Sequence, residues 1–395
     1  MSILLSDADH WKRLLPLTFT RPVGALRPGM LTIADAWWRM TEMPIGYRTE
    51  EYLRAKYPEV KSEAVREVDA SLLPSPDLVS AVLDLEAGQA LVKDGRALAF
   101  CIAGENKVAI GDWSAVPAYF TVNEFAGDVV RFDRPWRIFQ HCGAAIINDF
   151  ALLTEGRRSQ RLSAYNTVIG DPNLIFLEEG AVVEASILNT KNGPIYIGKN
   201  AEVMEGCMIR GPLALGEGAQ LKMGAKIYGP CAFGPECRVG GEVNNSVLLG
   251  FSNKGHDGFL GNSVLGEWCN LGADTNTSNL KNTYGEVKAW SYAEEAMIDT
   301  GTRFCGMVMG DHSKSGINTM FNTGTVVGVC ANIFGSDFPP KHVPSFSWGG
   351  ANGLSTYALD KAIETCKRVM ERRHVAFTSV DEAMLRHVFE ASAPK

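Results

Sequence analysis

The feature that most constrains the fold is a six-residue repeat between residues 197 and 239. One apolar residue stands at every sixth position: Ile197, Val203, Ile209, Leu215, Leu221, Ile227, Phe233 and Val239. Four positions after most of these stands a small residue, namely Ala201, Cys207, Ala219, Ala225, Cys231 or Cys237, with Leu213 as the exception. A period of six is typical of a parallel β-helix, in which short strands are joined by tight corners. The large residue is expected to point into the coil, and the small one leaves room for it near the corner.

The repeat continues in both directions. The upstream positions in step are Ile175, Ala181 and Ile187. After an interruption at residues 243–262, the downstream pieces are Leu265-Gly266, Leu271-Gly272, Met309-Gly310, Val327-Gly328 and Ile333. With three hexads in each coil, residues 175–338 predict roughly nine coils.

Composition narrows the class of protein. The chain has 395 residues and a formal net charge of −7, which argues against a nucleic-acid partner. Its nine cysteines include no CxxC pair, so neither a zinc ribbon nor a disulfide framework is indicated. The first residues are too short and too acidic for a signal peptide, and no apolar run has the length of a membrane span. A cytoplasmic location is therefore expected.

The coil divides the chain into three predicted domains: a mixed α/β domain over residues 1–155, the coil over 156–350, and helices over 351–395. In the first, Ile3-Leu4-Leu5 reads as a strand, residues 31–40 as a helix, and residues 90–100 as a hairpin around Lys93-Asp94-Gly95-Arg96. In the last, an amphipathic helix is predicted over residues 356–373, and a capping box, Ser379-x-x-Glu382, opens another. These helices are expected to cover the open end of the coil, with a role in trimer contact as the alternative.

A loop rich in arginine follows the first strand. Arg13, Arg21 and Arg27 lie in a stretch broken by proline and threonine. In an open α/β sheet this is where the phosphates of a nucleotide bind, and arginine binds phosphate in a bidentate manner. On residue type alone, three solvated arginines on a turn are the simpler interpretation.

The loop resembles the signature of sugar-nucleotide pyrophosphorylases. Arg13 falls on the signature arginine, Pro16-Leu17-Thr18 on the next element, and Pro22 on the signature proline; the signature glycines are absent and Val23 replaces a lysine. Asp69 falls on the metal-binding aspartate of that family. The resemblance implies a nucleotide site formed by Arg13, Thr18 and Arg21, with Asp69 as ligand of a Mg²⁺ ion bound with a nucleoside triphosphate. An active domain and a degenerate one are equally compatible with it.

The coil carries a second resemblance. Residues 256–279 and 309–319 are similar to the catalytic stretch of the bacterial bifunctional N-acetylglucosamine-1-phosphate uridyltransferase/glucosamine-1-phosphate acetyltransferase family, and residues 1–373 look like its Bacteroidetes-type variant. The resemblance implies a left-handed β-helix, a homotrimer, acetyl-coenzyme A as co-substrate and a role in cell-envelope biosynthesis.

By this resemblance His256 falls on the catalytic histidine. It lies in a polar, glycine-rich break of the repeat, and a neutral imidazole is a suitable base for an amine nucleophile. Without the resemblance, an exposed loop histidine would be the simpler interpretation. His256 and His312 are isolated from other histidines, which argues against a zinc site shared between chains.

Other positions match the two substrate sites of the family. Asn270 falls on a sugar-binding asparagine and Phe259 on a tyrosine of the same pocket. Asn244 stands where the family has a phosphate-binding lysine, and Lys254 or Lys226 are candidate replacements. The predicted coenzyme A groove consists of Ala273, Asn279, Gly316 and Ile317, the last in place of a serine.

These matches predict a transferase of a sugar-nucleotide pathway. Its reaction would be acyl transfer from acetyl-coenzyme A to an amino sugar phosphate, with a linked sugar-1-phosphate nucleotidyl transfer in the first domain. The alternative is a non-catalytic trimer that binds a nucleotide sugar or acts as a scaffold.

Overall fold

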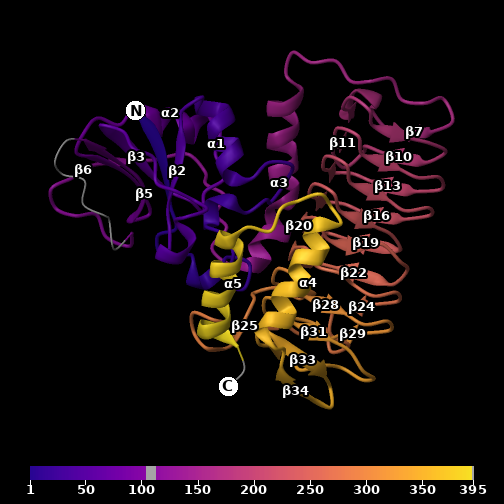
Figure 1. Cartoon of the computed structure of the whole chain (residues 1–395). Coiled ribbons are helices and arrows are strands. Elements are labelled where there is room, and N and C mark those ends of the chain that lie inside the picture. Colours follow the sequence, from indigo (N-terminus) through magenta and orange to yellow (C-terminus); the bar gives the residue numbers. More distant parts are fainter. Residues whose placement is uncertain (104–112, 394–395) are drawn as a thin grey trace. The chain divides into compact units, whose positions relative to one another are not determined.

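The computed structural model describes residues 1–103 and 113–393, which form two compact units (Figure 1). The first unit consists of Met1–Leu14, Arg21–Arg27 and Leu31–Arg134, and the second of Leu15–Thr20, Pro28–Met30 and Pro135–Lys395. Two short segments of the arginine-rich loop therefore cluster with the second unit. The predicted division into residues 1–155, 156–350 and 351–395 stays a prediction.

The first unit is built on a six-stranded sheet with the order β2-β1-β3-β5-β4-β6. Its strands are β1 (Ser2–Ser6), β2 (Ile45–Arg48), β3 (Ala64–Asp69), β4 (Gln89–Lys93), β5 (Arg96–Ala103) and β6 (Thr121–Glu124). β1 is parallel to β2 and β3, whereas β5 is antiparallel to β3 and β4. The predicted hairpin is confirmed: Asp94 and Gly95 turn between β4 and β5 with φ of 51° and 76°.

The helices of the first unit begin at clear caps. Helix α1 (Ile33–Thr41) starts with a capping box between Thr32 and Asp35, and Ser75 caps α2 (Pro76–Leu83). Short 3₁₀ turns lie at Lys12–Leu14, Val23–Ala25 and Glu51–Leu53. All five residues of β1 are buried, as expected for a central strand with both faces covered. The predicted strand and helix are thus confirmed.

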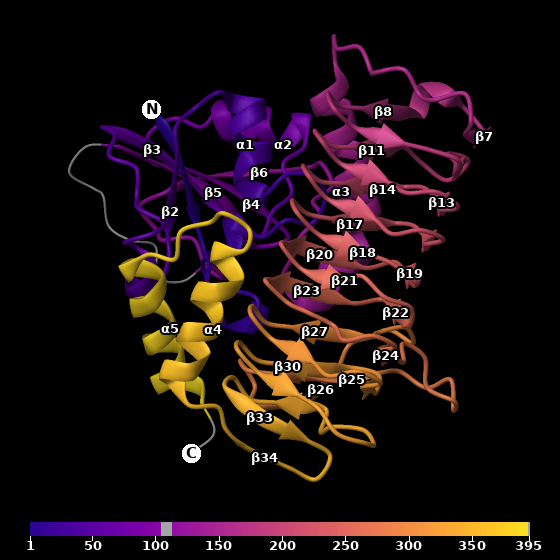
Figure 2. The ribbon, with the colours of Figure 1, turned by 45° about the vertical axis from the view of Figure 1, so that its right-hand side comes forward.

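The second unit contains the predicted left-handed parallel β-helix, whose three faces are named here after their first strands. The β7 face comprises β7 (Thr167–Ile169), β10 (Ile187–Asn189), β13 (Met208–Arg210), β16 (Lys226–Tyr228), β19 (Glu242–Asn244), β22 (Phe259–Gly261), β24 (Asn276–Thr277) and β29 (Met320–Phe321). The β8 face comprises β8 (Ile175–Leu177), β11 (Ile195–Ile197), β14 (Leu213–Leu215), β17 (Cys231–Phe233), β20 (Val247–Gly250), β23 (Val264–Glu267), β27 (Met307–Met309), β30 (Thr325–Val327) and β32 (His342–Val343). The β9 face comprises β9 (Val182–Val183), β12 (Glu202–Val203), β15 (Gln220–Leu221), β18 (Arg238–Val239), β21 (Asn253–Lys254), β28 (Lys314–Ser315), β31 (Asn332–Ile333), β33 (Ser347–Gly350) and β34 (Gly353–Thr356). Figure 2 shows the short strands stacked coil upon coil.

The hexad prediction is confirmed over its main stretch. All eight apolar positions from Ile197 to Val239 are at most 1% exposed and belong to one continuous core. Ile195 pairs with Leu213, and Leu213 with Cys231, so that one coil takes three hexads. Large side chains thus stack on equivalent side chains of the next coil.

Outside this stretch the phase differs from the prediction. Ile187 is 40% exposed, and its neighbour Leu188 takes the inward position, so the upstream assignment was wrong there. Residues 243–262 do not interrupt the stack. Instead the coil between Ala232 and Val247 is shorter than three hexads, which removes the periodic signal but keeps the pairing of the strands. The long insertion follows later, around the hairpin of β25 (Lys288–Ser291) and β26 (Ala296–Asp299).

Helices of the same unit cover two of the three faces. Helix α3 (Pro135–Thr154) packs on β17, β20 and β23 of the β8 face. Helix α4 (Leu359–Glu371) lies along the β9 face, where its Cys366 Sγ is 3.8 Å from Cys330 Sγ. Helix α5 (Ser379–Ser392) packs Phe389 against Phe346, with ring centroids 5.0 Å apart.

Two details of the C-terminal prediction were wrong. The helices lie along the flank of the coil, whereas at its end β34 pairs antiparallel with β33 and extends the β9 face. The capping box of α5 is formed by Thr378 and Asp381, one residue earlier than expected. Among the described residues, no helix combines the length and apolarity needed to cross a bilayer.

Candidate functional site

Four of the predicted residues come together along one edge of the coil, between the β9 and β7 faces. His256 lies in the corner between β21 and β22, and Ala273 and Ile317 lie in the same corner of the next two coils. Backbone hydrogen bonds link these corners: Asp274 N donates to Asp257 O (3.1 Å) and Asn318 N to Ala273 O (2.9 Å). We call His256, Ala273, Gly316 and Ile317 the His256 edge. Asn279 lies apart, beyond β24, where its side chain donates to Asn262 Oδ1 (2.8 Å).

The His256 edge is accessible. The His256 side chain is exposed, and no other described residue forms a hydrogen bond with its imidazole. Ile317 is 71% exposed although it is apolar. The edge therefore combines the imidazole of His256, which has no hydrogen-bond partner among the described residues, with the exposed apolar side chain of Ile317. This combination suits a general base next to an acyl chain.

Lys254 has a different role from the predicted one. It takes an inward position in the coil, opposite Val239, and is 2% exposed. Its Nζ donates to Gly240 O (3.0 Å) and to His256 O (2.6 Å), and burial lowers its pKa to about 8. The side chain is therefore buried, and its Nζ contacts the backbone of the turn that carries His256.

We expect Lys254→Met to separate stability from activity. At pH 7 the lost hydrogen bonds are offset by relief of a buried ammonium, so stability should change by less than about 1 kcal/mol, while kcat falls because the His256 turn loosens. The folded-state pKa of about 8 lies below the unfolded 10.5, so wild-type stability should rise between these pH values. Denaturation at pH 7 and pH 10 should show this rise in the wild type and not in the variant. Equal pH dependence in both proteins would disprove the assignment.

The other predicted acceptor residues lie on two sides of the His256 edge. Lys226 and Phe259 occupy equivalent positions of the β7 face, each paired with Glu242, and Asn244 pairs with Gly261 beside Phe259. Asn270 lies on the β9 face, next to Asn253. The structure thus groups Lys226, Asn244 and Phe259 on one face and places Asn270 on the other.

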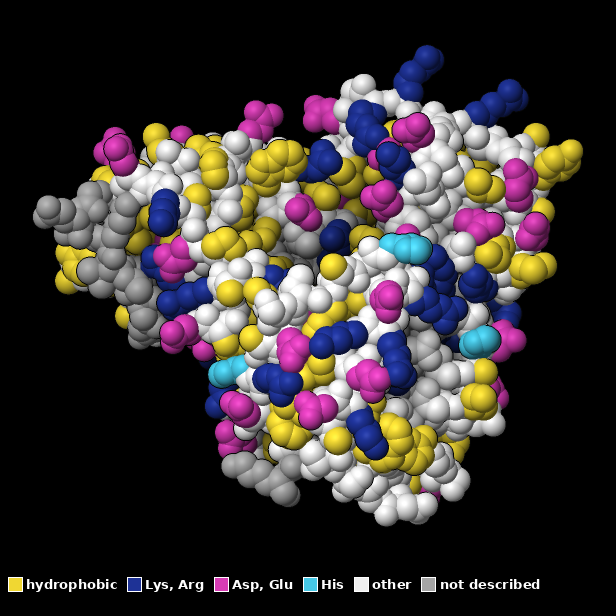
Figure 3. Space-filling view, viewed as in Figure 1, with side chains coloured by type: hydrophobic (Ala, Val, Ile, Leu, Met, Phe, Trp, Pro, Cys, Tyr) yellow, Lys and Arg dark blue, Asp and Glu magenta, His cyan; other side chains and the backbone are white. Residues whose placement is uncertain are grey.

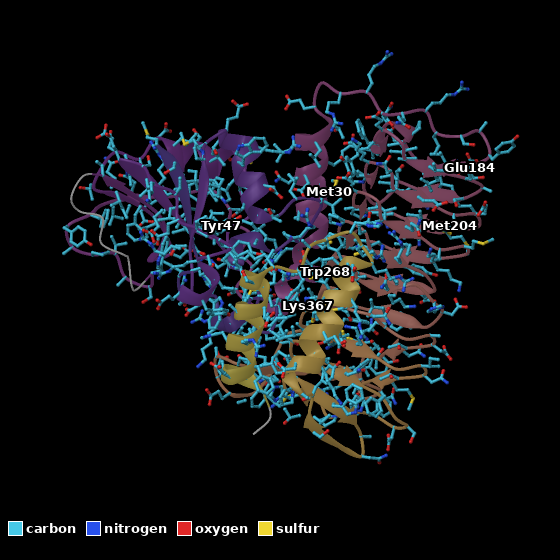
Figure 4. The ribbon with its side chains drawn as sticks, viewed as in Figure 1. Met30, Tyr47, Glu184, Met204, Trp268 and Lys367 are labelled. Atoms are coloured by element: carbon cyan, nitrogen blue, oxygen red, sulfur yellow. The ribbon has the colours of Figure 1, made fainter. Side chains whose placement is uncertain are left out.

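A groove of about 790 Å³ lies on the β9 face, between the coil and the C-terminal end of α4. His256 and Asn270 line it together with basic side chains that sequence reasoning missed: Lys222, Arg238, Lys314, Arg372 and Arg373. We call it the basic groove. Figure 3 shows Lys and Arg side chains gathered beside α4, and Figure 4 places Trp268, another lining residue, next to this helix.

A column of polar residues forms the floor of the basic groove. Arg238, Asn253, Asn270 and Lys314 pair in succession, one from each of four coils, and point outward from the β9 face. These positions directly precede inward residues of the repeat. This position in the repeat is the one sequence signal that could have revealed them. To use it, one has to know how the strands pair across the shortened coils.

The first unit has a charged cluster at the carboxyl end of β3. Asp69, fully buried, accepts through Oδ1 from Ser71 N (2.9 Å) and Oγ (2.6 Å), and through Oδ2 from Arg131; His10 Nε2 lies 3.2 Å from Oδ2. Burial by itself would raise the pKa of Asp69, but His10 and Arg131 hold it well below its usual range. Arg96 completes the cluster, 3.9 Å from Asp69.

This cluster does not fit the Mg²⁺ site that the resemblance implied. Both Asp69 oxygens already accept hydrogen bonds, and two guanidinium groups and an imidazole stand where a cation would bind. In the described part of the chain, no group of three or more His, Cys, Asp or Glu side chains could hold a metal. Asp69 is the centre of an ion-pair network here.

The predicted nucleotide residues are only partly accessible. Arg13 is 36% exposed and pairs with Asp9 (Nη2–Oδ2 3.1 Å). Thr18 is fully buried and belongs to the second unit, whereas Arg21 is 3% exposed in the first. Buried side chains of this kind do not form an open phosphate site. Within the first unit Arg96 pairs with the same Asp9 carboxylate as Arg13 and is 24% exposed.

Comparison with known proteins gives matches to parts of the chain. Residues 3–158 match the family described as sugar nucleotidyl transferase. A bifunctional sugar-1-phosphate nucleotidylyltransferase/acetyltransferase of Sulfurisphaera tokodaii is 34% identical over 41% of this chain and 40% of its own length. A bifunctional protein GlmU of Methanocaldococcus jannaschii is 29% identical over 34% of this chain and 28% of its own. The chain thus spans less than half the length of these relatives.

Similar solved structures are also found. An Arabidopsis UDP-N-acetylglucosamine acyltransferase matches over 58% of this chain and 96% of its own, with 12% identity and a TM-score of 0.25. A match with that TM-score does not support a fold assignment. The β-helix follows from the strand pairing of this chain itself. By sequence, therefore, residues 3–158 resemble sugar nucleotidyl transferases, and part of the chain is similar to a bifunctional sugar-1-phosphate nucleotidylyltransferase/acetyltransferase and to a bifunctional protein GlmU.

Proposed function

We propose that the coil transfers an acetyl group from acetyl-coenzyme A to the amino group of a sugar phosphate. The observation that carries this proposal is the His256 edge. There an exposed imidazole lies in line with the small Ala273 and the apolar Ile317, and it also lines a groove rich in basic groups. The acetyltransferase activity in the name of the Sulfurisphaera relative supports it.

In this reaction His256 acts as general base. Its imidazole takes a proton from the amine while the nitrogen attacks the thioester carbonyl. The C–S bond then breaks, and the imidazolium returns this proton to the sulfur, so that the coenzyme leaves as thiol. Ala273 and Ile317 hold the acyl chain along the edge, and Asn270 hydrogen-bonds the sugar. Lys254 keeps the His256 turn in place.

Product analysis tests the proposal. The purified chain is incubated with acetyl-coenzyme A and glucosamine-1-phosphate, with and without UTP, and free thiol and N-acetylated product are measured. Stoichiometric release of both is expected. No product from this acceptor or from a panel of other amino sugar phosphates would overturn the proposal.

We infer a homotrimer from the exposed apolar residues of the β7 face. Helices of the chain's own second unit cover the β8 and β9 faces, whereas the β7 face has exposed apolar side chains, Ile187, Met208, Tyr228 and Met320, from 39% to 46% accessible. Such a stripe is typical of an interface. A partner packed there would border the His256 edge and the face of Lys226, Asn244 and Phe259, which would complete the acceptor site.

We therefore expect light scattering to give about three times the chain mass of 42.9 kDa. Met208→Glu should weaken the trimer, because a carboxylate buried in an apolar contact costs several kcal/mol. An exposed residue of α4, Glu364, is the matched control as Glu364→Ala. A wild-type monomer with full activity would disprove the prediction.

For the first unit we infer nucleotide-sugar binding without turnover as a second candidate function. The arrangement around Asp69 favours it. Arg131 and His10 interact with the Asp69 carboxylate, which a metal-dependent transfer would need as a ligand of the metal. The family match to sugar nucleotidyl transferases supports a nucleotide ligand.

Calorimetry with UTP and UDP-sugars checks this second function. Binding is expected to be unchanged when Mg²⁺ is replaced by EDTA. Arg13→Ala should weaken binding by about 1.5–3 kcal/mol through loss of a charge-assisted phosphate contact, whereas Arg39→Ala, on the exposed side of α1, should have no effect. Uridylyl transfer that requires Mg²⁺ would favour an active nucleotidyltransferase instead.

A further inference from the structure

The residues that face the coil change from apolar to basic at the C-terminal end of α4. Along most of the helix, apolar residues pack on the coil: Ala362, Ile363, Cys366 and Met370 are at most 6% exposed. Beyond Met370 the helix presents Arg372, Arg373 and His374 to the groove, opposite the polar floor column. A helix that only stabilised the coil would have apolar residues here as well.

The lining of the basic groove carries more positive than negative charge. In the described lining, Glu236 is the one carboxylate, against five Lys and Arg side chains. Arg238 Nη2 and Arg373 Nη1 share a single oxygen of it, Oε2, at 2.9 and 3.0 Å. This local excess of positive charge occurs in a protein whose net charge is −7. Such a concentration of like charge is stabilised by a bound anion.

The individual cations point to the same conclusion. Burial lowers the pKa of both Lys222 and Arg373, and the charge of the neighbouring Arg238 lowers it further. Arg373 is also held by Asn253 Oδ1 (2.9 Å), so it anchors α4 to the coil. Arg372 is exposed, and no described residue pairs with its guanidinium. It is the group best placed to bind a ligand without disturbing the fold.

We propose that α4 and the coil together form a phosphate-binding site in the basic groove, with Arg372 from the helix and Lys314 from the coil as its principal ligand contacts. Arginine and lysine are the side chains that bind phosphate esters most strongly. The groove volume of about 790 Å³ exceeds what one phosphate needs and fits a whole phosphorylated substrate. Because His256 lines the same groove, that substrate reaches the His256 edge. The inference depends on the proposed acyl transfer in one respect only, namely the identity of the substrate that carries the phosphate.

Binding of inorganic pyrophosphate tests the site directly, without any reaction. By calorimetry we expect wild-type binding that weakens with salt. Arg372→Ala should reduce the affinity at least about tenfold, the scale of one charge-assisted hydrogen bond, and Lys314→Gln should reduce it similarly. Arg368→Ala, one turn earlier on α4 and paired with Glu364, is the matched control and should bind like the wild type. No binding to the wild type, or equal binding by the Arg372 and Arg368 variants, would overturn the proposal.

Kinetics then identify the source of the phosphate. If it belongs to the acyl donor, Arg372→Ala raises KM for acetyl-coenzyme A and not for acetyl-pantetheine, which lacks the nucleotide. If it belongs to the acceptor, the variant raises KM for glucosamine-1-phosphate and not for glucosamine. An unchanged KM for all four compounds would overturn a substrate role. Pyrophosphate binding that depends on Arg372 in a chain without acyl transfer would uphold the site and reject the proposed function.

Discussion

Replacing His256 with alanine is expected to lower kcat for acyl transfer by about 10²- to 10⁴-fold, the usual contribution of a general base. Coenzyme A binding and the oligomeric state should be unchanged, because the side chain is exposed on a corner and contributes nothing to the core. Steady-state kinetics, calorimetry and light scattering measure the three quantities.

A matched control is a histidine outside the site. His312 is unsuitable, because it is 8% exposed and stacks on Trp268, with centroids 6.1 Å apart, so its loss would disturb packing. His387 is exposed on α5, and His387→Ala should retain full activity. If His256→Ala turned over the true substrate at the wild-type rate, the base mechanism would be wrong.

Replacing Phe233 with alanine should destabilise the chain by about 3–5 kcal/mol. Phe233 is 1% exposed and lies in the β8 face between Leu215 and Leu248 of the adjacent coils. Hydrogen bonds between coils fix the strand spacing, so the walls cannot close around the cavity. Denaturant unfolding of the full chain measures the effect. Tyr165→Ala, at a residue 83% exposed, should stay within about 0.5 kcal/mol, and an equally small loss for Phe233→Ala would contradict the stacked core.

Predictions from the sequence succeeded where neighbours along the chain decide the outcome. The eight hexad positions are inward because each apolar residue meets its equivalent one coil away, and the repeat itself sets that distance. The hairpin at Asp94-Gly95 and the helix at Ile33 depend on turn and cap residues within a few positions. The His256 edge was also predictable in part, since the corners of regular coils stack in order.

Only the tertiary structure decided the rest. From the sequence, Lys254 is interpreted as a loop lysine, because a single coil of different length does not appear as a period. In the structure the shortened coil places its side chain inward. Asp69 matches a metal ligand by position, yet Arg131, which lies far from it in the sequence, neutralises it. The basic groove joins Arg238 on the coil to Arg372 at the end of a helix much later in the chain. Local sequence fixes which residues face inward, whereas a site between a coil and a distant helix depends on how the two pack, and that is set by their buried surfaces as a whole.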